Sequence, residues 1–248
     1  MIIDGRVHLG EGLFGQRQTV TDLLERMDRL QIDRAILTPL RPQHYHLASE
    51  NERVADAVRN RPDRFLGVCR VDPWQGADAV TELRRSVRDL GLRGVYLNPW
   101  EENFPINDEI VHPVVREAAR LGVPVLINAG QVRVSHPTQV ADLARQFPEV
   151  RFIAANGGNL NISGMLLSEA RAMLDACPNV VIETSGTYRE DFLEEVMAEV
   201  GPDRVVFASG TPYYDQEFEM ERVRCAHLGE QEKMAMWSGT LRQLYQWD

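Results

Sequence analysis

The chain has 248 residues and a formal net charge of −10, with 27 Lys and Arg against 37 Asp and Glu. This length suits one large α/β domain over residues 1–248 and does not require a second domain. An acidic chain without a basic run lacks the clustered Lys and Arg that bind phosphates, so we expect neither nucleic acid nor a membrane as a partner. Three widely spaced cysteines and the lack of a long apolar stretch predict a soluble, cytoplasmic protein.

Short apolar runs rich in β-branched residues recur along the chain and predict eight strands. In chain order they cover residues 2–8, 34–38, 65–71, 94–98, 123–128, 150–156, 180–185 and 204–209. Amphipathic stretches lie between them. Ser49 to Glu52 resembles a capping box at the start of one helix, and Asp108 precedes another apolar stripe. Residues 230–248 predict a terminal helix that packs outside the strands.

Short strands separated by helices are typical of parallel β/α units, in which both faces of the sheet are buried. Eight such units in this length predict a single (β/α)8 TIM barrel with an additional C-terminal helix. An open, doubly wound sheet is the alternative. It has less support, because no Gly-x-Gly-x-x-Gly motif follows any of the runs and dinucleotide binding is therefore not indicated.

In such barrels the active site lies at the C-terminal ends of the strands. Polar side chains stand at most of these ends here, namely Arg6, His8, Thr38, Arg70, Asp72, Tyr96, Asn98, Asn128, Asn156, Glu183, Ser185 and Ser209. Arg6 and His8 are two positions apart in the first strand, so their side chains point to the same face. A His-x-His pair there would hold a metal ion, but a guanidinium has no lone pair to donate and repels a cation.

Several of these segments resemble the amidohydrolase superfamily, whose members include metal-dependent hydrolases and decarboxylases of small carboxylic acids. Residues 3–8 resemble its opening Ile-Asp-x-His-x-His motif, and residues 123–128 resemble Pro-x-x-Ile-His. Residues 152–158 are similar to a strand that ends in Ala-His-x-Gly, and residues 204–212 to Phe-Gly-Ser-Asp-x-Pro. The resemblance covers nearly the whole chain and implies a TIM barrel.

The resemblance also locates the family's metal ligands, and most of them are replaced in this sequence. The corresponding positions hold Arg6, His8, Asn128, Asn156 and Gly210, and the family's bridging lysine corresponds to Tyr96. Zinc needs three or four N, O or S ligands, and one imidazole with two amides falls short. Gly210 also removes the aspartate that serves the family as a base. We therefore expect no metal and no cofactor.

The replaced centre is still polar. A divalent ion with one aspartate carries one net positive charge, and so does Arg6 without the aspartate. This predicts a metal-free pocket for a small anionic, carboxylate-type molecule, with Arg6 as a bidentate partner and His8 as a donor, acid or base near neutral pH. Arg6 and His8 are the catalytic candidates. The predicted substrate-binding residues are Arg6, His8, Tyr96, Asn98, Asn128, Asn156, His44, His46 and Tyr213. The alternative is that Arg6 pairs with Asp4 or Glu183 and fills an inactive centre.

Loops at the same edge hold further candidates. His44 and His46 form a displaced His-x-His, and His136 follows the fifth strand, so a relocated metal or a substrate contact is one interpretation; solvated loop histidines are the other. Asp215 is either a relocated base or an exposed turn residue. Trp100 is either part of a pocket wall or lid, or packs against a neighbouring subunit.

Three functions remain open at this point. The first is a metal-independent hydrolase, lyase or cyclase acting on a small acid. The second is an inactive homologue, a pseudoenzyme, that partners or regulates an active relative. The third is a ligand-binding or sensor barrel. The family resemblance suggests a homodimer or a heterodimer with an intact relative.

Overall fold

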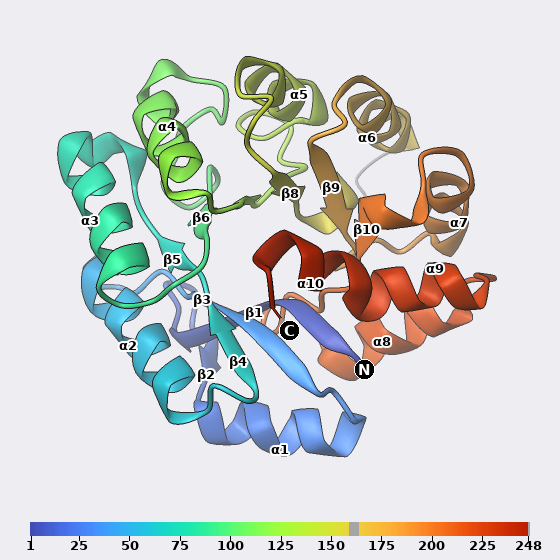
Figure 1. The fold of residues 1–248 in the computed structure, drawn as a ribbon, viewed down its shortest axis with the longest axis horizontal. Helices are drawn as coiled ribbons and strands as arrows, with labels where there is room; N and C mark the ends of the chain where they lie inside the picture. The colour runs from blue at the N-terminus through green and yellow to red at the C-terminus, as the bar shows by residue number, and fades with distance from the viewer. Residues whose placement is uncertain (159–163, 248) are drawn as a thin grey trace.

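The computed structural model describes residues 1–158 and 164–247, in which parallel strands alternate with helices around a ring (Figure 1). The parallel strands are β1 (Ile3–Glu11), β3 (Arg34–Pro39), β4 (Phe65–Gly67), β5 (Cys69–Arg70), β6 (Val95–Leu97), β7 (Val125–Ile127), β8 (Phe152–Ala154), β9 (Val180–Glu183) and β10 (Val205–Val206). They correspond to the eight predicted runs, with β4 and β5 forming the third. A short β2 (Arg17–Gln18) pairs antiparallel with the end of β1.

The strands form a closed barrel, although their hydrogen bonds divide them into two sheets, β2-β1-β3-β4 and β10-β9-β8-β7-β6-β5. The third strand changes partner at Val68, whose N–H donates to the Leu37 carbonyl at 2.8 Å. On the opposite side the Gly5 N–H donates to the Phe207 carbonyl at 2.9 Å, which joins β1 to the segment after β10. The predicted TIM barrel is therefore confirmed.

Helices cover the outside of the ring (Figure 1). They are α1 (Val20–Leu30), α2 (Leu47–Asn60), α3 (Ala77–Arg88), α4 (His112–Leu121), α5 (Pro137–Gln146), α6 (Gly164–Ala176), α7 (Glu190–Glu199) and α8 (Gln216–Cys225). Single helical turns, η1 (Pro73–Gln75), η2 (Glu109–Val111), η3 (Asn156–Gly158) and η4 (Pro202–Arg204), lie in the connections. No helix in the described ranges is long and apolar enough to cross a membrane.

Two predicted helix starts are at different places in the structure. The capping box at Ser49 is wrong, because α2 begins at Leu47 and the Ser49 hydroxyl donates to the His46 carbonyl at 2.8 Å inside the first turn. Asp108 does act as a cap, but of the short η2 turn that leads into α4, where its carboxylate accepts from the Ile110 N–H at 3.1 Å.

The C-terminal segment closes one end of the barrel. It comprises α9 (Glu230–Met234), the π-helical turn η5 (Ala235–Gly239) and α10 (Thr240–Tyr245). Leu241, Tyr245 and Trp247 join the apolar side chains inside the ring, among them Ile3 at the start of β1 and Val206 in β10. The predicted position outside the strands is therefore wrong, since α10 lies across the middle of the ring (Figure 1). With the amino-terminal end sealed by apolar packing, the opposite end is left for a polar site.

Candidate functional site

A pocket of about 270 Å³ opens at the carboxyl ends of the strands. It is lined by Arg6, Phe14, Gln16, Tyr96, Asn98, Trp100, Glu101, Asn128, Gln131, Asn156, Tyr213 and Tyr214. Six of the predicted substrate-binding residues are therefore brought together, namely Arg6, Tyr96, Asn98, Asn128, Asn156 and Tyr213. The sequence analysis missed Phe14, Gln16, Glu101 and Gln131, which lie in loops.

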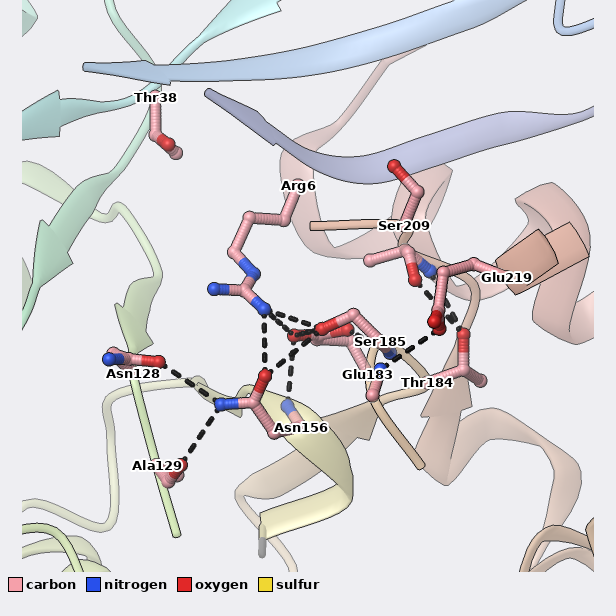
Figure 2. Close-up of polar contacts among 12 residues, drawn as sticks. Arg6, Thr38, Asn128, Ala129, Asn156, Glu183, Thr184, Ser185, Ser209 and Glu219 are labelled. Carbon is pink, nitrogen blue, oxygen red and sulfur yellow. Dashed lines mark hydrogen bonds and ion pairs between the residues drawn. The ribbon is translucent and has the colours of Figure 1, made fainter. Parts of the chain in front are cut away.

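Arg6 is buried, with 3% of its surface exposed, and one end of its guanidinium is fixed. Nη2 lies 2.9 Å from Glu183 Oε1, donates to Asn156 Oδ1 at 3.0 Å and also donates to the Ser185 hydroxyl (Figure 2). The other terminal nitrogen points away from this cluster in Figure 2. Burial is the largest influence and lowers the pKa of Arg6, but Glu183 together with Tyr96 and Tyr214 raises the pKa above its ordinary value. The guanidinium therefore stays charged.

Glu183 is the partner that the alternative interpretation of Arg6 named. Its carboxylate also accepts from the Asn156 N–H at 3.0 Å, the Ser185 N–H at 2.6 Å and the Ser185 hydroxyl at 2.8 Å. Asp4, the other named partner, instead accepts from the Ser209 hydroxyl at 2.6 Å and from Gln216 Nε2 at 2.7 Å. The predicted net positive charge is wrong for this part of the pocket, because it was counted without Glu183.

The three asparagines form a hydrogen-bonded row that starts at Arg6. Asn156 Nδ2 donates to Asn128 Oδ1 at 3.0 Å and to the Ala129 carbonyl at 3.0 Å (Figure 2). Asn128 Nδ2 donates to Asn98 Oδ1 at 2.9 Å. Asn156 has a φ of 58°, a left-handed conformation that asparagine tolerates better than most residues, and this turns its side chain into the barrel mouth.

His8 is buried beside the pocket and does not line it. Its ring packs on Tyr96 and Tyr213, with centroids 5.5 and 5.0 Å away, and Nδ1 lies 2.7 Å from the Thr38 hydroxyl. Burial lowers the pKa of His8 well below its ordinary value, and the charges of Arg6 and Arg70 lower it further. Burial and these two charges therefore disfavour the protonated imidazole, and the acid–base role of His8 stays a prediction.

A second buried guanidinium, Arg70, holds the loop after β6. Its Nη2 donates to Glu102 Oε1 at 2.6 Å and also pairs with Glu101, and its Cζ lies 5.4 Å from the centre of the Tyr96 ring. Glu101 Oε1 accepts from the Tyr213 hydroxyl at 2.7 Å, so this loop sets one wall of the pocket. The sequence did hold a signal for this contact. Glu101 and Glu102 are adjacent acidic residues that follow one strand, and Arg70 ends the preceding strand.

The residues that the resemblance matches to the family's metal ligands do not fit a divalent ion. Arg6 puts a cation in the centre, and the amides of Asn128 and Asn156 are bonded to each other. Gly210 has a φ of +67°, and a Cβ there would lie 3.0 Å from Arg6 Nη2, so the guanidinium takes up space beside the missing side chain. In residues 1–158 and 164–247, no group of three or more His, Cys, Asp or Glu side chains is arranged to hold a metal ion.

The loop histidines and Asp215 are not brought to the pocket. His44 stacks on His46 with centroids 5.3 Å apart, and both line other cavities. His136 caps α5 and lies 2.8 Å from Glu169. Asp215 is an exposed cap, accepting from the Phe218 N–H at 2.9 Å at the start of α8. Trp100 does line the pocket wall.

Comparison with known proteins identifies a family to which the chain is similar. The Amidohydrolase family model matches residues 3–246. The gamma-resorcylate decarboxylase of Rhodococcus jostii (strain RHA1) is 23% identical over 236 residues, covering 74% of this chain and 71% of the relative. That of Rhizobium sp. (strain MTP-10005) is 22% identical over 246 residues, covering 80% and 75%.

Solved structures share the fold at lower identity. The 5-carboxyvanillate decarboxylase from Sphingomonas paucimobilis superposes with a TM-score of 0.81 at 17% identity, covering 99% of this chain and 98% of the other. A dihydroxybenzoic acid decarboxylase from Polaromonas sp. JS666, solved with bound manganese and the inhibitor 2-nitroresorcinol, gives 0.77 at 15% identity and covers 99% and 96%. At these identities the likeness supports the barrel fold alone, and the reaction has to be inferred from the residues of the site.

Proposed function

Because this chain belongs to the amidohydrolase family, we propose that it is a metal-independent member that binds a small, planar carboxylic acid and acts as a hydrolase, lyase or cyclase. The observation that carries the proposal is the fixed Arg6 guanidinium in the barrel mouth, at the position of the family's first metal-ligating histidine. A guanidinium pairs with a carboxylate through two hydrogen bonds, a contact that requires no metal.

The pocket walls support a planar ligand. Tyr96, Tyr213 and Trp100 supply aromatic faces around a cavity that is small for a ligand site. The relatives fit this class, since gamma-resorcylate and 5-carboxyvanillate decarboxylases are named for carboxylated phenols. We infer that the ligand of this chain is likewise a small ring acid or a molecule of similar shape.

Proton transfer falls to Glu101 and Tyr213 in this proposal. Glu101 lines the pocket and accepts the Tyr213 hydroxyl at 2.7 Å, so a proton has a short path between the ligand and the carboxylate. His8 packs against the rings of Tyr96 and Tyr213 and does not line the pocket, so we assign it the support of these rings.

The test is binding of benzoate and 2,6-dihydroxybenzoate to protein stripped of metal with a chelator, measured by titration calorimetry. We expect both to bind the wild type, and Arg6→Met to weaken binding at least about tenfold, the size of one lost charged hydrogen bond. Arg88→Met, which removes an exposed arginine of α3, is the matched control and should bind as wild type does. Binding that needs added manganese, or that survives Arg6→Met unchanged, would refute the proposal.

A second candidate is a pseudoenzyme that partners an active relative. The observation that favours it is the Arg6–Glu183 pair, which satisfies the centre without a ligand. Incubating the metal-free protein with 2,6-dihydroxybenzoate and following its consumption by chromatography separates the two candidates. Consumption that is lost in Arg6→Met supports the enzyme. Binding without consumption, together with co-purification of an intact relative, supports the pseudoenzyme.

A further inference from the structure

The orientation of the asparagine row is fixed by groups that can only donate or only accept. At one end, the Ala129 carbonyl can only accept, so it receives Asn156 Nδ2, while the Arg6 guanidinium can only donate, so it faces Asn156 Oδ1. At the other end, the Glu101 backbone N–H points to Asn98 Oδ1 at 3.3 Å. The two ends therefore set their amides independently of each other.

The middle residue then has only one possible orientation. Asn128 must offer its oxygen to Asn156 Nδ2 and its nitrogen to Asn98 Oδ1. Turning any one of the three amides would bring two donors or two acceptors face to face inside a buried site, which is costly. The row thus runs in one direction, from the arginine to Asn98.

This direction decides what the row offers to a ligand. Both N–H hydrogens of Asn156 are used, one on Asn128 and one on the Ala129 carbonyl. Asn128 uses one of its two, and Asn98 uses none on any described residue, while Asn98 Oδ1 already accepts twice. Because all three side chains line the pocket, the free groups of the row at the Asn98 end are donors.

We propose that Asn98 determines specificity by selecting a ligand edge made of acceptor oxygens without hydrogens, namely a carboxylate, and by rejecting an amidine or amide of the same shape. The inference rests on the proposed function and deepens it. It also explains how an anion binds where Glu183 balances the charge of Arg6, because oriented N–H groups supply the attraction in place of net charge.

The deciding variant is Asn98→Asp, which keeps the shape of the side chain. One carboxylate oxygen still accepts from Asn128 and from the Glu101 N–H, while the other replaces the Nδ2 donor with an acceptor. The probes are benzoate and benzamidine, which share a ring and a planar head group but present acceptors and donors respectively. We expect wild type to prefer benzoate. Asn98→Asp should lose about 10- to 100-fold in benzoate affinity and bind benzamidine more tightly than benzoate.

Two controls separate donor orientation from added charge. Gln131→Glu adds the same negative charge to the same pocket outside the row, and should shift both affinities only about threefold while benzoate stays preferred. Asn60→Asp, at the exposed end of α2, should change neither affinity. If Gln131→Glu reverses the preference as fully as Asn98→Asp does, charge alone explains the result and the inference is wrong.

A further variant covers the case in which Asn98→Asp does not fold, as judged by circular dichroism and thermal melting. Asn98→Ala removes the donors without adding an acceptor, and should weaken benzoate by a similar factor with no gain for benzamidine. The two proposals fail in different ways. Loss of benzoate binding in Arg6→Met together with an unchanged preference in Asn98→Asp and Asn98→Ala overturns this inference alone, whereas a wild type that binds no carboxylate overturns the proposed function.

Discussion

Two buried arginines stand beside Tyr96 in the barrel mouth, and their surroundings differ. Arg6 lines the pocket and meets one carboxylate, Glu183, together with neutral groups. Arg70 does not line this pocket and meets two carboxylates, those of Glu101 and Glu102, through a single nitrogen. Burial is similar in both cases, so burial alone does not distinguish a structural arginine from a ligand-binding one.

The distinction lies in what each carboxylate would keep without its arginine. Glu183 would still accept two backbone N–H groups and the Ser185 hydroxyl. Glu102 Oε1 would lose its 2.6 Å bond to Arg70, and Oε2 has no hydrogen-bond partner among the described residues. Arg70 is therefore needed to hold its loop, whereas the Arg6 site can survive the loss of Arg6.

The largest effect is expected from Arg70→Met. The change leaves Glu101 and Glu102 adjacent with only Arg41, whose Nε lies 3.9 Å from Glu102 Oε1, as a counter-charge, and removing one partner of a buried ion pair costs about 3–5 kcal/mol. We expect a loss of this size in the free energy of unfolding, measured by urea denaturation. A loss under about 1 kcal/mol would mean that the loop is held by other contacts.

The pH dependence of stability should reveal Glu102. Burial raises the pKa of Glu102 to about 7, more than the nearby Arg70 lowers it, while the ordinary value is 4.5. The folded state then binds this proton more tightly than the unfolded state. The stabilisation that protonated Glu102 gives the folded state is therefore complete below pH 4.5 and is lost as the pH rises toward 7. The expected loss is on the order of 3 kcal/mol. Urea denaturation at pH 5 and 7.5 should show a steeper fall in wild type than in Glu102→Gln; parallel curves would contradict the prediction.

Arg6→Met should cost less stability than Arg70→Met, about 1–2 kcal/mol, because Glu183 keeps its other donors. Denaturation of both variants under the same conditions measures the difference directly. Equal losses would show that the remaining hydrogen bonds of Glu183 do not compensate for the missing charge, and the contrast between the two arginines would fail.

Much of the fold could be predicted from the sequence because buried parallel strands are dense in β-branched residues, which mark each strand locally. The wrong predictions concern the position of the last helix and the start of α2, which the local residue pattern does not determine. Apolar residues at 241, 245 and 247 indicate that the last helix is buried, but they do not indicate that it seals the barrel instead of packing on its outside. The start of α2 was misplaced because the Ser49 hydroxyl bonds back to its own turn, a choice that the residue pattern leaves open.

The site could be predicted in part for a related reason. The rule of strand ends located Arg6, Tyr96 and the asparagines, since register brings these ends to one edge. Glu101 and Gln131 follow their strands in loops without periodicity, and the sequence gives no position for such side chains. The charge of the pocket was misjudged because Glu183 was counted as one alternative partner, and only the packed structure shows it against Arg6.

The smallest effect tests whether Arg6 is held as firmly as its bonds suggest. Gly210→Ala should be destabilising, because φ is +67° and the new Cβ would lie 3.0 Å from Arg6 Nη2. In an Arg6→Ala background the close approach of the new Cβ to Arg6 Nη2 disappears, while the backbone strain and the contact with Tyr214 remain. The double variant should therefore lose less stability than the sum of the single losses, by about 0.5–1 kcal/mol. Additive losses would show that the guanidinium moves aside freely, which its bonds to Glu183, Asn156 and Ser185 argue against.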